Sequence, residues 1–437
     1  MTNCSISVYT ICITIFILVL FMPAGLADNN LKTATSHAEI ASGSPTNTNL
    51  HLVSTFEGGR LYEAGKFNVA VLNGTYLEMG RQYGGLLGHQ ILGMHKELSN
   101  DEQSILAAME NLSTKKSSDN MTLEDFTNYS IQLYPKRFQE MIRGMSETSD
   151  LSEEDIGKIN EFLRYYVFWK WLEEPDAGAG HCSAMVAWGN YTGGNPLVMG
   201  RNFDATRFFE KFDKYLTVVV FNPSDGSNSA AIFTYAGMIG SPQTFNDAGL
   251  VLEGDDASTA GDSNRPINRV PVQVREIQLA LDCSNLAGLD SGIMSSRISH
   301  SLINVVANES GAYCYESTTF DVKRRGGIDG LLVAANHFLI PDWNCEGIFT
   351  NETSSSHTMM DSVSRHQNLT ALGNKHKGKI NATVMMAIFD TLTKDGGATL
   401  PLDTTYQFVA VPEERMIWLK APGFEDWREV NLGALFE

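Results

Sequence analysis

The chain changes its residue pattern once, near residue 180, and this change limits its fold more than any other feature. Residues 75–172 carry apolar side chains mostly at helical spacing, with capping signals at Thr75–Glu78 and Ser152–Asp155. From Ser183 onward, short apolar runs of strand length alternate with turns and with a few helical patterns. Helices and strands in separate blocks predict an α+β fold built in layers, with a mainly helical N-terminal segment.

The patterns also predict individual elements. We expect helices at 75–98, 101–112, 122–148, 152–172, 269–282, 287–296 and 380–394. We expect strands at 67–72, 184–188, 196–199, 215–221, 230–235, 250–252, 302–306 and 330–335, and a closing hairpin over 406–419. Residues 28–50, rich in Ser, Thr, Asn and Ala, predict a flexible lead-in. The first helix carries glycines at helical spacing, which would let a second element pack closely: Gly80, Gly84, Gly85 and Gly88.

The N-terminus predicts export. Residues 1–27 hold no charged side chain, residues 6–22 are apolar, and Gly25 and Ala27 fit a signal-peptidase site. A retained anchor is the alternative, because an apolar run of about 17 residues is near the shortest span of a membrane helix. We expect a protein that is secreted or lies in an extracytoplasmic lumen such as that of a lysosome. Membrane anchoring would follow only if the leader were retained.

Glycosylation signals and cysteines agree with an oxidising compartment. Nine Asn-x-Ser/Thr triplets follow the leader, although chance explains several of them in a chain rich in Asn and Thr. They begin at Asn73, Asn111, Asn120, Asn128, Asn190, Asn308, Asn351, Asn368 and Asn381. Four cysteines remain after the leader: Cys182, Cys283, Cys314 and Cys345. If one of them is a free nucleophile, at most one internal disulfide can form, and its pairing stays open.

Charge and missing motifs exclude several functions. Lys and Arg number 32 and Asp and Glu 51, so the net charge of −19 opposes binding to nucleic acid. The chain has no Cys-x-x-Cys pair and no His-Glu-x-x-His motif, so we predict neither a metal nor a cofactor. Asp255, Asp256 and Asp262 lack the spacing of a calcium loop, and we interpret them as a solvated loop. The oligomeric state stays open.

Cys182 is the residue around which a reaction can be built. It stands between a glycine-rich stretch and a predicted strand, and a second strand ends in Gly200-Arg201-Asn202-Phe203-Asp204. If the two strands are antiparallel neighbours, these ends meet. A guanidinium beside the thiol would lower its pKa and favour the nucleophilic thiolate. The alternative is a small buried hydrophobic residue, which is a common role for cysteine.

Further motifs accompany Cys182 and Gly200–Asp204: Gly74-Thr-Tyr-Leu-Glu78-Met-Gly80-Arg-Gln-Tyr-Gly84, Ala335-Asn336-His337-Phe338 and Ser364-Arg365. In their order and spacing, these motifs resemble a known group, the linear-amide hydrolases with an N-terminal nucleophile. The resemblance is greatest to the penicillin acyltransferase branch, which is related to acid ceramidase-like amidases and choloylglycine hydrolases. It covers about residue 66 to the C-terminus and implies a four-layer αββα sandwich.

The resemblance implies self-cleavage between His181 and Cys182. The chain would then consist of a signal peptide (1–27), a lead-in and mainly helical segment (28–181) and a catalytic chain (182–437). By matching position, Cys182 would be the nucleophile, Arg201 would stabilise charge, Asp204 would orient the new α-amine, Asn336 would bind the oxyanion, and Arg365 would hold the Asn336 and Asp204 region. The resemblance gives no role to His337. Where the bile-acid branch has an oxyanion-binding Asn, this chain has Glu253-Gly-Asp-Asp256.

We therefore expect an exported amidohydrolase or acyltransferase that cleaves a linear amide C–N bond through a cysteine thioester. Its substrate would be a small amide or a lipid-like molecule. Two alternatives stay open. One is a lipid esterase that resembles the phospholipase B-like proteins, and the other is a binding glycoprotein that keeps the fold without catalysis.

Overall fold

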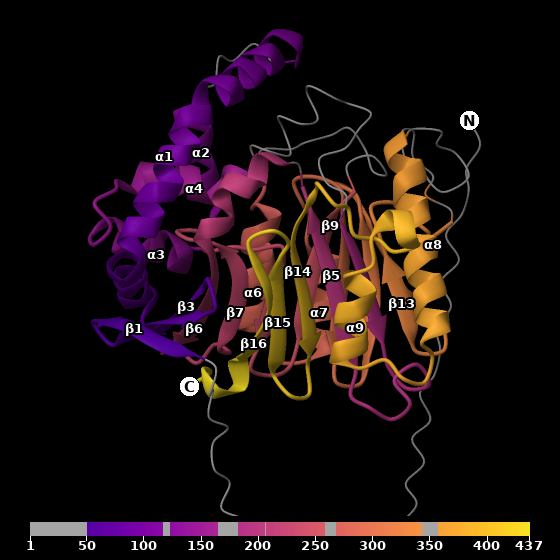
Figure 1. The fold of residues 1–437 in the computed structure, drawn as a ribbon. Coiled ribbons are helices and arrows are strands. Elements are labelled where there is room, and N and C mark those ends of the chain that lie inside the picture. Colours follow the sequence, from indigo (N-terminus) through magenta and orange to yellow (C-terminus); the bar gives the residue numbers. More distant parts are fainter. Residues whose placement is uncertain are drawn as a thin grey trace, which may run out of the picture. The chain divides into compact units, whose positions relative to one another are not determined.

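The computed structural model describes residues 50–116, 123–164, 182–205, 207–257, 268–341, 343 and 357–437. All of them fall within one unit, Ser44–Glu437. They form a mixed α/β structure with two β-sheets and flanking helices (Figure 1). The predicted signal peptide and nearly all of the lead-in lie outside the described residues, as do Asn120, His181, Asp262, Cys345 and Asn351.

The larger sheet has ten strands in the order β1-β2-β3-β6-β7-β8-β9-β10-β11-β12. Its neighbours pair antiparallel except β3 and β6, which are parallel. Strands from before and after residue 181 therefore share one sheet. Their bounds are β1 His51–Phe56, β2 Gly59–Ala64, β3 Phe67–Gly74, β6 Leu216–Pro223, β7 Ala230–Tyr235, β8 Gln243–Asn246, β9 Val251–Asp256, β10 Leu302–Asn308, β11 Gly311–Ser317 and β12 Val322–Gly326.

The smaller sheet has six antiparallel strands in the order β13-β4-β5-β14-β15-β16. It places β4 and β5 side by side with Ser183 opposite Asn202, which confirms the predicted pairing of the two strands. The bounds are β4 Ser183–Ala187, β5 Val198–Asp204, β13 Leu331–Ala334, β14 Thr404–Val411, β15 Met416–Ala421 and β16 Glu425–Asn431.

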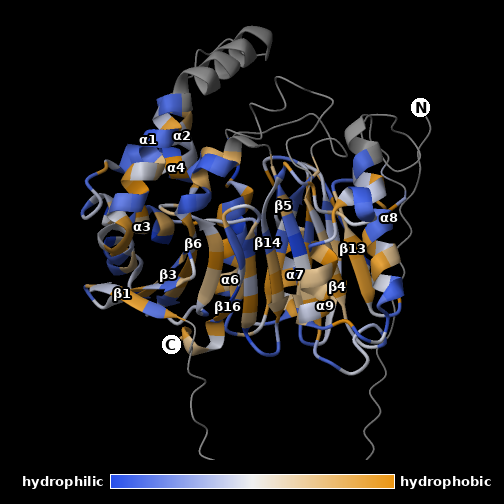
Figure 2. Ribbon diagram, in the orientation of Figure 1, coloured by the Kyte–Doolittle hydropathy of each residue, from blue (hydrophilic) through white to orange (hydrophobic). Residues whose placement is uncertain are grey.

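Helices contact both sheets. Helix α1 packs on β3 and α6 on β7, β8 and β9, whereas α8 contacts β13 and β4, and α9 contacts β5 and β14. Figure 2 shows hydrophobic and hydrophilic residues mixed along α2 and α8, but a mainly hydrophobic α9. The bounds are α1 Tyr76–Lys116, α2 Leu123–Leu133, α3 Lys136–Ser146, α4 Glu153–Asn160, η1 Arg207–Tyr215, α6 Val272–Asp282, α7 Leu286–Ser295, α8 His357–Lys375, α9 Ala382–Phe389, η2 Thr393–Asp395 and η3 Leu432–Ala434.

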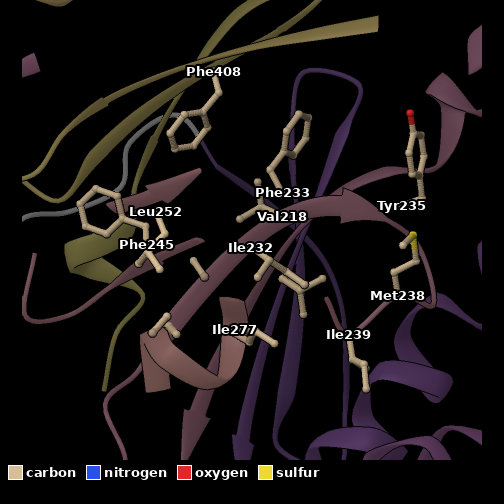
Figure 3. Packing of buried hydrophobic residues seen from close by; sticks show 14 of the residues in the cluster. Val218, Ile232, Phe233, Tyr235, Met238, Ile239, Phe245, Leu252, Ile277 and Phe408 are labelled. Carbon is tan, nitrogen blue, oxygen red and sulfur yellow. The ribbon is translucent and has the colours of Figure 1, made fainter. Parts of the chain in front are cut away.

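Side chains of the two sheets meet in a common core. Figure 3 shows Phe408 of β14 close to Phe233 and Phe245 of the larger sheet. Nearby, Tyr406 of β14 stacks on Phe203, with ring centres 4.6 Å apart, and meets the edge of Phe233 at 4.9 Å. Aromatic pairs of this kind add to the free energy gained from burying the rings. The two sheets therefore contact each other through buried apolar side chains.

The structure corrects several sequence predictions. The predicted helix 122–148 is two helices, because Pro135 lies between α2 and α3 and lacks the backbone N–H that a continuous helix needs. The predicted helices 75–98 and 101–112 are one long helix, α1, kinked at Leu87. Helix α8 and strands β1, β2, β8, β11, β12 and β16 were not predicted. Both predicted capping signals are confirmed by hydrogen bonds within Thr75–Glu78 and Ser152–Asp155.

The glycines of α1 allow the close packing that the sequence predicts. A Cβ atom added at Gly80 would lie 2.2 Å from the carbonyl oxygen of Met141 on α3. One added at Gly84 would lie 2.6 Å from the carbonyl oxygen of Met145, and Gly144 of α3 faces α1 in the same way. Gly88 differs, since its nearest contact would be 3.6 Å away. Among the helices described, none has an apolar stretch long enough for a transmembrane span.

Candidate active site

Cys182 lies directly before β4 and is buried. Its Sγ lies 3.9 Å from the main-chain oxygen of Asp204, the last residue of the neighbouring strand β5. Burial raises the pKa of the thiol to about 12; Arg201 opposes this effect, and Asp255 and Asp204 add to it. In the intact chain the cysteine is therefore a protonated thiol. The expected lowering of its pKa by Arg201 is present but is outweighed.

Arg365 joins the nucleophile to the predicted oxyanion residue. It is fully buried on α8. Its Nη1 donates to the carbonyl oxygen of Cys182 at 2.7 Å, and its Nη2 donates to Oδ1 of Asn336 at 2.9 Å. Its Nε donates to Asp361 at 2.8 Å. Three charge-assisted hydrogen bonds in one plane fix these partners to the same guanidinium.

Asn336 follows β13 and is held on both sides of its amide group. Its Nδ2 donates to the main-chain oxygen of Asp256 at 2.7 Å, and its backbone N–H donates to Oγ of Ser362 at 2.8 Å. The amide NH₂ has a second hydrogen, and no acceptor for it lies among the described residues. Asn336 could give that hydrogen to a substrate oxygen without losing its support.

His337 supports the loop that carries Asn336. Its Nδ1 lies 2.7 Å from Oγ of Ser362, and its ring meets that of His366 at 5.7 Å. Burial lowers the pKa of His337 to about 3 and that of His366 to about 4. Both rings are neutral at ordinary pH. His337, to which the sequence analysis gave no role, thus packs against His366 next to Asn336 in the chain.

Asp204 is buried and holds only one of its carboxyl oxygens in a hydrogen bond. Thr404 donates to its Oδ1 at 2.5 Å, whereas Oδ2 has no partner among the described residues. Burial raises the pKa of Asp204 to about 8, and Arg365 lowers it in part. Arg365 acts on Asp204 through charge and not through the expected hydrogen bond. The Oδ2 atom could accept one further hydrogen bond.

Arg201 does not donate to the thiol. It is completely buried, and its Nη1 donates to Oε1 of Gln243 at 2.6 Å and its Nη2 to the carbonyl oxygen of Gly254 at 2.7 Å. It also forms ion pairs with Glu253 and Asp255 of β9, at 3.2 and 3.5 Å. Arg201 therefore reaches Cys182 only through its charge and crosslinks the two sheets.

The acidic segment of β9 corrects the sequence prediction. Asp255 and Glu253 are fully buried strand residues and not part of a solvated loop, while Asp256 is partly buried. The resemblance pointed to this segment, but its burial was not predicted, because alternate carboxylates look like surface residues unless their cation is known. Their cation, Arg201, stands on the other sheet. Glu253 and Asp255 therefore belong to the site as the buried ion-pair partners of Arg201.

The asparagines of the predicted glycosylation triplets differ in their exposure to solvent. Asn128, Asn190 and Asn381 are exposed. The amide nitrogens of Asn73 and Asn368 instead donate to backbone oxygens, at 3.2 and 2.8 Å.

Cys283 and Cys314 carry free thiols. In the described part of the chain no group of three or more His, Cys, Asp or Glu side chains could hold a metal ion.

Comparisons with known proteins give only remote likenesses. No family model matches the chain. No curated protein matches it either. The solved structures similar to it include an N-acylethanolamine-hydrolyzing acid amidase ortholog from Caenorhabditis elegans, at 15% identity and a TM-score of 0.38, over 53% of this chain and 93% of that one.

Two bacterial structures have comparably low sequence identities and TM-scores. A mutant of a conjugated bile acid hydrolase from Clostridium perfringens is 11% identical, with a TM-score of 0.41 over 57% of this chain and 92% of that one. Penicillin V acylase from Agrobacterium tumefaciens is 12% identical, with a TM-score of 0.41 over 59% and 88%. Such values assign no activity to this chain. The three structures are N-terminal-nucleophile hydrolases, the group that its motifs resemble.

Proposed function

We propose that the protein is an amidohydrolase or acyltransferase whose nucleophile is Cys182, after cleavage of the His181–Cys182 bond. One observation carries the proposal: the Arg365 guanidinium binds both the Cys182 carbonyl oxygen and the Asn336 side chain, at 2.7 and 2.9 Å. A nucleophile and an amide donor are thereby fixed to one rigid group. Covalent catalysis on a carbonyl needs both at once.

The proposed cleavage uses Cys182, which lies directly before the buried strand β4. The Sγ attacks the carbonyl carbon of His181, the C–N bond breaks, and the nitrogen of Cys182 takes the thiol proton and becomes a free amine. Water then hydrolyses the thioester and frees residue 181 as a carboxylate. The new α-amine, with an ordinary pKa of about 7.7–8.0, lies within the same residue as its thiol.

The catalytic step uses the same atoms. The α-amine accepts the thiol proton while Sγ attacks the substrate carbonyl, and the resulting oxyanion receives the second N–H of Asn336. The ammonium proton passes to the leaving amine as the C–N bond breaks. Water, or an acceptor amine, then cleaves the thioester. Asp204, with its unpartnered Oδ2, is suited to hold the α-ammonium in place.

The same proposal covers the layering of the fold, the two chains after cleavage, export and the substrate. We propose that the two sheets are the inner layers of an αββα sandwich, supported by the contacts of α6 with one sheet and of α8 and α9 with the other. Residues 28–181 and 182–437 would be the two chains after cleavage. Export in a glycosylated form is supported by the exposure of Asn128, Asn190 and Asn381. The substrate would be a small or lipid-like amide.

Acyl-coumarin substrates test the proposal. The full-length protein is assayed with an amide of aminocoumarin and with the ester of hydroxycoumarin that carries the same acyl chain. Turnover of the amide, lost in Cys182→Ala, is the expected result. Exclusive turnover of the ester would instead favour a lipid esterase, and no turnover together with no labelling of Cys182 by iodoacetamide would favour a binding protein.

A further inference from the structure

Glu253 and Asp255 present two buried acids to one buried cation. Both side chains project from the same face of β9 and have no exposed surface. Glu253 Oε2 lies 3.2 Å from Nε of Arg201, and Asp255 Oδ1 lies 3.5 Å from its Nη2. If both acids were ionised, this group of three would carry one uncompensated negative charge inside the protein.

Hydrogen bonds do not compensate for that charge. None of the four carboxyl oxygens of Glu253 and Asp255 accepts a hydrogen bond in the described part of the chain. Arg201 directs its Nη hydrogens to Gln243 and to the carbonyl oxygens of Pro242 and Gly254 instead. A buried carboxylate without donors is strongly disfavoured against its protonated form. The two side chains are neighbours on one face of β9 and bind the same guanidinium, and a hydrogen bond between two carboxyl groups needs a proton.

Surrounding charges decide which acid keeps the proton. Burial raises the pKa of both acids, but for Asp255 the positive charges of Arg201 and Arg365 oppose this effect. Glu253 feels the negative charge of Glu276, which lies across β9 on α6 beside Gly254. The other titratable groups that act on the pair are Cys182, Asp204, Asp256, Cys314 and Tyr406. This arrangement favours an ionised Asp255 and a neutral Glu253.

We infer that Glu253 and Asp255 hold one proton between them, carried by Glu253 and donated to Asp255, and that its loss adds a negative charge beside Cys182 that suppresses its thiol chemistry. The effect on Cys182 rests on the proposed function, whereas the shared proton does not. Glu253 is thus a positioning residue: it keeps Asp255 and Arg201 paired one to one. Cys182 is therefore reactive at pH values at which Glu253 keeps its proton.

The pH dependence of stability follows from the same arrangement. Burial and the charge of Asp255 raise the pKa of Glu253 well above its ordinary value. A group whose pKa is raised by folding stabilises the fold fully below its unfolded pKa, which is about 4.3 for glutamate. That stability is lost as pH rises toward the folded pKa. Glutamine, which resembles the protonated acid, should remove this loss.

Thermal unfolding of the full-length protein between pH 4 and pH 9 tests the shared proton. Glu253→Gln should unfold at a temperature about 2–4 °C above wild type at alkaline pH and close to wild type at pH 4. Asp255→Asn should unfold at a lower temperature than Glu253→Gln, because the negative charge of Glu276 disfavours an ionised Glu253 as the remaining partner of Arg201. An equal loss in both variants, or a wild-type slope in Glu253→Gln, would overturn the inference.

Glu316→Gln is the matched control for removing a buried acid. Glu316 is also fully buried, but it accepts hydrogen bonds from Leu339, Ile340, Trp343 and Arg325. Its replacement weakens these hydrogen bonds, so Glu316→Gln should unfold at a lower temperature than wild type and should show no gain at alkaline pH. Asp204 contributes to the slope in wild type and in each of these variants, so the comparison between them isolates Glu253.

Amide hydrolysis measures the link to Cys182. In Glu253→Gln the alkaline limb of the rate profile should move to higher pH, because no second carboxylate can form. A limb that stays in place would overturn the link. If neither protein hydrolyses the amide while the unfolding temperatures behave as expected, the shared proton stands and the proposed function fails.

Discussion

Arg365 donates a hydrogen bond from Nη1 to the carbonyl oxygen of Cys182 over 2.7 Å, although the two residues lie 183 positions apart in the chain. The same guanidinium binds Asn336 and Asp361. Helix α8 thereby fixes the start of β4 and the end of β13 together. In the proposed reaction this single contact sets the distance between the nucleophile and the oxyanion donor.

Replacing Arg365 with Lys should damage the site although the charge is kept. A lysine cannot form three planar hydrogen bonds, so the Cys182 oxygen or the Asn336 side chain loses its donor. We expect a loss of at least about 2 kcal/mol in the free energy of unfolding, measured in urea. Arg324→Lys is the control, since Arg324 forms an exposed ion pair with Asp290 and should change stability little. Equal effects in the two variants would contradict the role of Arg365.

Replacing Cys182 with Ala should lower the rate of amide turnover by more than about 10⁴-fold, as the loss of the nucleophile does in other enzymes. The control is Cys283→Ala, because Cys283 is a free, partly buried thiol at the end of α6. It should keep wild-type turnover. Initial rates with the coumarin amide compare the two variants with wild type. Substantial activity of the Cys182→Ala protein would rule out a thioester at Cys182.

Asp204 predicts a pH-dependent stability in the uncleaved chain. Its pKa is raised to about 8 by burial, against about 3.9 in an unfolded chain. Stability is therefore complete below about pH 4 and falls as pH rises through about 8. In the Cys182→Ala background, which stays uncleaved, Asp204→Asn should flatten this decline in chemical unfolding. An unchanged decline would mean that Asp204 is ionised in the folded protein.

The contact between α1 and α3 predicts opposite effects for two glycines. Gly80→Ala places a Cβ 2.2 Å from a backbone oxygen of α3, so it should destabilise the fold by about 1–3 kcal/mol. Gly88→Ala has space for the methyl group and should stabilise by about 0.5–1 kcal/mol through helix propensity. Unfolding in urea compares the two. Similar values for both would show that the close packing is not rigid.

Adjacent strands are the part of the site that the sequence could predict. Cys182 and the Arg201–Asp204 segment are close in the chain, and a single antiparallel pairing brings them together. Asn336 and Arg365 could be named only through resemblance to a family. Their position depends on α8, whose buried residues include the polar Ser362 and Arg365. A helix that turns polar side chains inward has no clear apolar stripe, so its pattern did not predict it.

The acids of β9 show the opposite difficulty. Glu253 and Asp255 alternate with Leu252 and Gly254, as strand residues do, but carboxylates indicate a solvent face. Only the position of Arg201 on the second sheet explains their burial. Charges that are paired across two sheets leave no signal in a single local segment. Long-range pairing of this kind is where local patterns lose their predictive power.

N-terminal sequencing combined with the intact mass of the deglycosylated protein tests the central claim most directly. The account predicts two fragments, one of which begins at Cys182. They should copurify because β3 and β6, on either side of the cleavage point, pair in one sheet. A fully active protein that remains one chain through residues 181 and 182 would contradict the account, since Cys182 would then lack the α-amine that activates it.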